Sequence, residues 1–107
     1  MELKTLIENL KKLPLEETRV DSQEGFECVV QTATLKALFS TLETFFGPAF
    51  KPVKQKPNPQ ALELTSSFGG IRDDQILYYK KKQKTSFMAM IWPWGNGQSA
   101  TVKIIRC

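Results

Sequence analysis

The segment TLKALFSTLETFF, residues 34–46, decides the fold of this chain. Its apolar side chains recur at helical spacing and form one broad stripe, made of Leu35, Leu38, Phe39, Leu42, Phe45 and Phe46. Thr34 stands where an N-cap belongs, and Gly47 and Pro48 end the pattern. Because aromatic side chains bury the largest area per residue, we expect residues 34–46 to form the central helix of the core.

Three different patterns precede this helix. Leucine and isoleucine at helical spacing predict a helix over residues 2–13, which Pro14 ends. Residues 15–24 are polar and acidic with little periodicity, so we expect a connector there. From Phe26 the pattern changes to the alternation that is typical of a strand.

Proline and lysine dominate the residues that follow the central helix. Residues 47–60 hold four of the six prolines and three lysines, so we expect a stiff, extended loop. Residues 62–106 predict an antiparallel meander, because runs of strand-forming residues alternate with turn signals. The expected strands are Leu62–Phe68, Gln75–Lys81, Ser86–Trp92 and Ser99–Arg106.

Together these elements predict a single α+β domain over residues 1–107. A curved antiparallel sheet of about four to five strands would pack on the central helix, with the N-terminal helix as an addition. A chain of 107 residues has room for about one hydrophobic core. Hydrophobic residues at 41% and charged residues at 24% are typical of globular proteins, which excludes disordered, collagen-like and coiled-coil classes.

We expect neither a membrane span nor an export signal. It holds no apolar run of about 18 residues, and it opens on a charged amphipathic pattern instead of a signal peptide. Its two cysteines, Cys28 and Cys107, allow one pairing, whereas small secreted domains usually carry several disulfides. We therefore expect a cytoplasmic protein with no membrane partner, in which Cys28 is an ordinary buried residue.

The absence of histidine excludes much catalytic chemistry. The chain can form no Ser-His-Asp or Cys-His pair and no histidine zinc site. Asp73 and Asp74 are adjacent carboxylates, but neighbours on a strand point to opposite faces, and in a turn they cap backbone N–H groups. Gly69 and Gly70 lack the spacing of phosphate-binding loops. We therefore expect no enzyme, no cofactor and no metal.

Charge is distributed unevenly along the chain. The net charge is −3 over residues 1–50 and +7 over residues 51–107. The excess lies in two clusters, Lys51, Lys54 and Lys56 on the proline-rich loop and Lys80, Lys81, Lys82 and Lys84 around a hairpin turn. With Tyr78 nearby to stack on a base, the second cluster is typical of a nucleic-acid surface. Alternatively, these lysines only solubilise hairpin tips and protect sheet edges.

Apolar side chains occupy both faces of the C-terminal strands. Phe87, Ala89 and Ile91 would face one way, and Met88 and Met90 the other. A sheet with one solvated face would instead alternate apolar with polar residues. The central helix covers one face, and the N-terminal helix would cover part of the other. The apolar side chains that stay uncovered on the second face predict a protein-binding surface, made of Tyr79, Met88, Met90 and Trp92.

The leading hypothesis is therefore a non-enzymatic interaction domain that binds a protein partner or forms a homodimer through this surface. The first alternative is a nucleic-acid-binding module that uses the two lysine clusters. The second alternative is a small-ligand carrier, or an enzyme, with a pocket between sheet and helix. An interaction domain should show a mass that depends on concentration, and a nucleic-acid binder should show an affinity that falls steeply with salt. A ligand carrier should show a deep apolar pocket.

Overall fold

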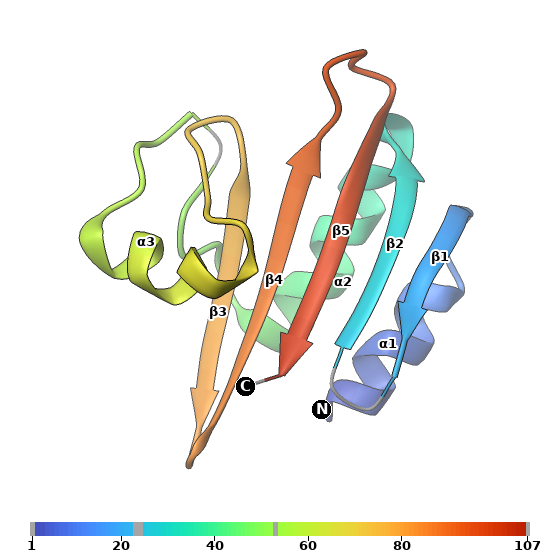
Figure 1. Ribbon diagram of the computed structural model, residues 1–107. Coiled ribbons are helices and arrows are strands. Elements are labelled where there is room, and N and C mark those ends of the chain that lie inside the picture. The colour runs from blue at the N-terminus through green and yellow to red at the C-terminus, as the bar shows by residue number, and fades with distance from the viewer. Residues whose placement is uncertain (1, 23–24, 53, 107) are drawn as a thin grey trace.

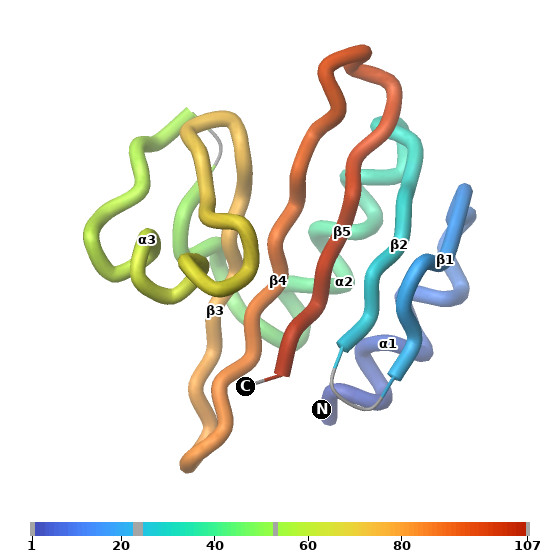
Figure 2. Tube along the Cα trace, in the orientation of Figure 1, coloured from blue at the N-terminus to red at the C-terminus, as the bar shows by residue number. Residues whose placement is uncertain are grey.

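The computed structural model describes residues 2–22, 25–52 and 54–106, which form a five-stranded antiparallel sheet with helices on both faces (Figures 1 and 2). The strands are β1 (Leu15–Asp21), β2 (Gly25–Gln31), β3 (Ile76–Lys82), β4 (Thr85–Pro93) and β5 (Ser99–Arg106). The α-helices are α1 (Leu3–Lys11), α2 (Leu35–Phe46) and α3 (Pro59–Thr65). The strand order is β1-β2-β5-β4-β3. The predicted α+β fold with a curved antiparallel sheet is confirmed.

Helices α1 and α2 lie side by side on one face of the sheet, which we call the inner face (Figure 1). Leu38 and Leu42 of α2 are fully buried in one cluster with Cys28, Ile91 and Val102 of the strands. The apolar stripe of α2 therefore lies at the centre of this core, as its width predicts.

The opposite, outer face is covered only in part. Over β3 and β4 it carries α3 and the 3-10 turn Ser66–Phe68 that follows (Figure 1). Ala61 of α3 shares a buried cluster with Leu77, Met88 and Met90. The sequence predicts that the N-terminal helix covers part of this face, but α1 packs beside α2 on the inner face instead.

The expected strand Leu62–Phe68 is wrong, because this segment is helical. The Asn58 side chain caps α3 by accepting a hydrogen bond from the Ala61 N–H at 2.8 Å, and Pro59 occupies the first turn. The covered positions recur at helical spacing and are Ala61, Leu64, Thr65 and Phe68. The other three expected strands of the meander are confirmed as β3, β4 and β5.

The expected connector over residues 15–24 is also wrong, because most of it forms β1. This edge strand pairs antiparallel with β2. Its side chains from Glu16 to Asp21 are all exposed, so no apolar alternation marks it in the sequence. Two register shifts against β2 disturb the two-residue period further, and such bulges also protect an edge from pairing with another chain.

Candidate functional site

Lys51, from the first predicted lysine cluster, is only 2% exposed and is engaged within the protein. Its Nζ donates hydrogen bonds to the carbonyl oxygens of Pro52, Asp73 and Gln75 at 3.1, 2.9 and 2.5 Å. Burial lowers the pKa of Lys51, and the negative charges of Asp73 and Asp74 oppose that effect. An ammonium group has three N–H donors, so Lys51 keeps none for a ligand.

Lys80 and Tyr78, from the second cluster, form hydrogen bonds with α2. The Lys80 Nζ donates to the Phe45 carbonyl oxygen at 3.0 Å and lies 4.6 Å from the Phe45 ring centroid. A cation at this place complements the C-terminal end of a helix. The buried Tyr78 hydroxyl donates to Glu43 Oε2 at 3.1 Å, and burial together with this bond raises the pKa of Tyr78. Tyr78 is therefore not placed to stack on a base at the surface.

The predicted protein-binding residues are divided between core and surface. Met88 and Met90 are buried beneath the α3 segment. Tyr79 is half-buried, with its ring centroid 5.7 Å from that of Phe50. Trp92 is half-buried as well, and its Nε1 has no hydrogen-bond partner among the residues that the structure describes. Only Tyr79 and Trp92 of this group reach solvent.

The exposed lysines of the hairpin lie near two cations from distant parts of the chain. Lys82 lines a hollow of about 280 Å³ together with Lys4 of α1 and Arg106 of β5. We call this cavity the basic hollow; its other lining residues are Glu2, Leu3, Phe45 and Phe87. In Figure 1 the hairpin tip, the start of α1 and the end of β5 all lie toward the bottom. We call the exposed cations there the basic end: Lys4, Lys81, Lys82, Lys84 and Arg106.

The cations of the basic end form no ion pair with a carboxylate among the described residues. The ion pairs within residues 2–22, 25–52 and 54–106 are Lys11–Asp21, Arg19–Glu17 and Arg19–Glu27. None of these pairs includes a cation of the basic end. Glu2 is the acidic side chain among the lining residues of the basic hollow. The basic end therefore keeps a local excess of positive charge.

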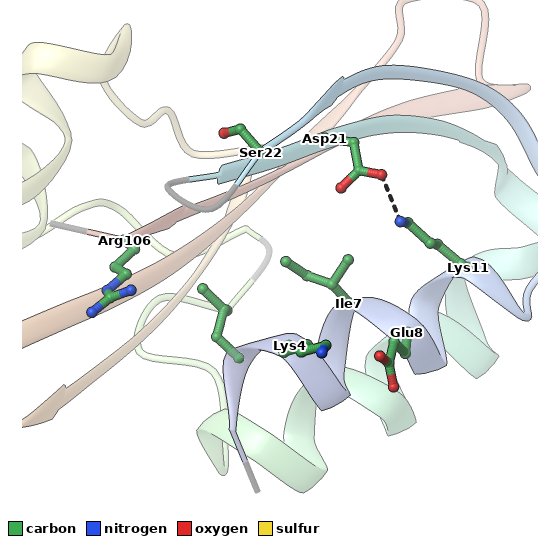
Figure 3. A pocket seen from close by; sticks show the side chains of 8 residues that line it. Lys4, Ile7, Glu8, Lys11, Asp21, Ser22 and Arg106 are labelled. Carbon is green, nitrogen blue, oxygen red and sulfur yellow. Dashed lines mark hydrogen bonds and ion pairs between the residues drawn. The ribbon is translucent and has the colours of Figure 1, made fainter.

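A second hollow of about 580 Å³ adjoins the first and shares Leu3, Lys4 and Arg106 with it. Figure 3 shows this second hollow between α1 and the end of the sheet, where Lys11 points to Asp21 and forms an ion pair with it. Lys4 lies near Glu8 on the surface of α1 in the same view. Two carboxylates, Glu8 and Asp21, thus face three cations here, whereas Glu2 is the one acidic lining residue of the basic hollow.

Lys4 and Arg106 were not among the residues predicted from the sequence. Each looks like an ordinary surface cation in its own segment, and strand register brings Arg106 to the hairpin. Arg106 lies opposite Phe87 of β4, and Phe87 lies opposite Lys80 of β3. A correct register between the last two expected strands would have been enough to place Arg106 beside the second lysine cluster.

Comparison with protein-family models, with curated proteins and with solved structures gives no match. Within the described ranges, no helix is long and apolar enough to cross a membrane. The same part of the chain contains no group of three or more histidine, cysteine, aspartate or glutamate side chains that could hold a metal ion.

Proposed function

We propose that the protein is a non-catalytic binding domain that holds a nucleic acid by its phosphates at the basic end. The observation that carries this proposal is the gathering of Lys4, Lys82 and Arg106, from three separate elements, around one hollow without ion-pair partners in the described residues. Unpaired cations on one surface attract a polyanion and release its counterions on binding.

A polymeric ligand fits the distribution of charge better than a small anion. Lys81 and Lys84 are exposed at the β3–β4 hairpin and are not among the residues that line the basic hollow. The positive surface therefore extends beyond the hollow, and a strand with several phosphates can contact both parts. Lysine contacts to phosphates carry little sequence information, so we expect binding that depends weakly on base sequence.

The proposal is tested by the anisotropy of a fluorescent single-stranded oligonucleotide, titrated with protein at about 50 mM salt and above. The variant Lys82→Gln/Lys84→Gln should bind more weakly, and its plot of log K against log salt should be less steep by about 1.4 for two lost contacts. The matched control is Lys54→Gln/Lys56→Gln, which removes the same charge from exposed lysines on the proline-rich loop.

The control should bind with nearly the wild-type slope, because its lysines lie away from the hairpin tip. Two results would contradict the proposal. One is no binding by the wild-type protein at about 50 mM salt, where electrostatic association is strong. The other is an equal loss in both variants, which would mean that only total charge matters.

A second candidate function is self-association through the uncovered part of the outer face. Val20 and Trp94 are among the most exposed large apolar side chains, at 46% and 36%. A groove of about 300 Å³ on this face is lined by Val20, Glu27, Phe68 and Lys103 among others. If this face pairs with a second copy, the mass in solution should rise with concentration, and Val20→Lys/Trp94→Lys should remain a monomer.

A further inference from the structure

We infer that the basic hollow receives the phosphate monoester at the end of a nucleic-acid strand. This inference rests on the proposed function and adds to it the part of the ligand that this cavity recognises. The basic end as a whole would contact phosphates along the strand, whereas the hollow would discriminate a phosphorylated end from a hydroxyl end.

The shape of the site favours a strand end. The basic hollow is lined from several directions, by Glu2 to Lys4 at the start of α1, by Phe45 of α2 and by residues of β3, β4 and β5. Phe45 and Phe87 pack edge to face in its wall, with ring centroids 5.4 Å apart. A phosphodiester within a strand needs room for the chain on both sides, whereas a terminal phosphate needs it on one side only.

The charge of the site also fits a monoester. Lys4, Lys82 and Arg106 line the hollow and Glu2 is its acidic lining residue, which leaves an excess of two positive charges. A phosphate monoester carries about −1.5 to −2 at pH 7, whereas a diester carries about −1. The guanidinium of Arg106 can donate to two phosphate oxygens at once, which strengthens a contact to a dianion.

The start of α1 adds hydrogen-bond donors to these cations. The Glu2 side chain makes no capping hydrogen bond, so it does not occupy the first N–H groups of the helix. Backbone N–H groups at a helix start favour an anion, and the first residues of α1 are among those that line the hollow with Lys82 and Arg106.

The test compares oligonucleotides of one sequence that end in a 5′-phosphate or a 5′-hydroxyl, with the fluorophore at the 3′ end, and a second pair with the label and the phosphate exchanged. The wild-type protein should bind one phosphorylated end about tenfold more tightly than the matching hydroxyl end, which corresponds to about 1.4 kcal/mol. The preference should fall below about pH 6, where the monoester loses its second charge.

Variants separate the hollow from the rest of the basic end. Arg106→Gln and Lys82→Gln should each reduce the preference for the phosphorylated end by several-fold. Glu2→Gln should increase it, because this change removes the acidic lining residue. Lys84→Gln is the control outside the hollow, and it should weaken binding to both ends by the same factor. Unchanged melting temperatures show that each variant is folded.

The outcomes distinguish this inference from the proposed function. Equal affinity of the wild-type protein for phosphorylated and hydroxyl ends, with both weakened by Lys84→Gln, would overturn the inference and leave nucleic-acid binding intact. No binding to any of the oligonucleotides would overturn both. A preference that survives in Arg106→Gln and in Lys82→Gln alike would place the end-binding site elsewhere and would also contradict the inference.

Discussion

Lys51 stabilises the fold through a buried ammonium group that joins two loops. Replacing it by methionine keeps the bulk of the side chain but removes the ammonium donor from the carbonyl oxygens of Pro52 and Gln75, and leaves that of Asp73 with the Lys54 N–H alone. We expect Lys51→Met to lower the free energy of unfolding by on the order of 3 kcal/mol in urea titrations. Lys54→Met, at an exposed position of the same loop, should change it by less than about 0.5 kcal/mol. Equal effects of the two would show that the hydrogen bonds of Lys51 contribute nothing.

Cys28 makes the stability of the protein sensitive to alkaline pH. Burial, together with the charge of Glu27, raises the pKa of the thiol from 9.0 to about 11. The unfolded thiol therefore ionises first, so this contribution to stability is complete below pH 9 and is lost as pH rises toward 11. The free energy of unfolding should fall more steeply between pH 9 and 11 in the wild-type protein than in Cys28→Ala. Because burial also raises the pKa of Tyr78, part of the decline should persist in that variant.

Residue identity alone does not reveal which lysines are available to a ligand. Lys51 and Lys80 look like solvent-exposed lysines in the sequence, yet both donate to carbonyl groups that lie 22 to 35 positions away. Such acceptors become visible only when the loops and strands are placed in space. Lys82, by contrast, is exposed and lines the basic hollow, and its role in binding stays a prediction. The sequence therefore identifies the cluster of lysines but does not separate those engaged within the protein from those exposed to solvent.

At the scale of elements, burial explains which predictions succeeded. The stripe of α2 marks a helix because Leu38 and Leu42 are fully buried on one side of it. β1 has no such pattern, since both of its faces are exposed and its register against β2 shifts twice. α3 does carry a helical pattern in Ala61, Leu64 and Thr65, but its short length allowed it to be taken for a strand.

The cap of α3 offers a test at this scale. Asn58→Ala removes the acceptor of the Ala61 N–H and should destabilise the protein by about 1 kcal/mol. Gln60→Ala, at an exposed position in the first turn of the same helix, should have little effect or a slightly favourable one. Both values follow from urea unfolding curves with equal slopes. A cost of Asn58→Ala no larger than that of Gln60→Ala would mean that packing alone holds α3 on the outer face.

At the scale of the whole molecule, the fold determines where the unevenly distributed charges of the sequence lie on the surface. The excess charge of residues 51–107 does not form one patch, because Lys51 is buried and Lys54 and Lys56 lie on a loop at a distance from the hairpin tip. The acidic first half contributes Lys4 to the basic end through the position of α1. Nucleic-acid binding should therefore depend on which lysines are replaced rather than on the net charge of the variant.

Charge reversal at two places separates these two possibilities. Lys81→Glu/Lys82→Glu/Lys84→Glu changes the net charge from +4 to −2, and so does Lys36→Glu/Lys54→Glu/Lys56→Glu. All six positions are exposed, so both triple variants should keep nearly the wild-type melting temperature. The first should lose detectable nucleic-acid binding at about 50 mM salt, whereas the second should retain it with a modest loss from the weaker long-range field. Equal binding by the two variants would show that net charge, and not the basic end, governs the interaction.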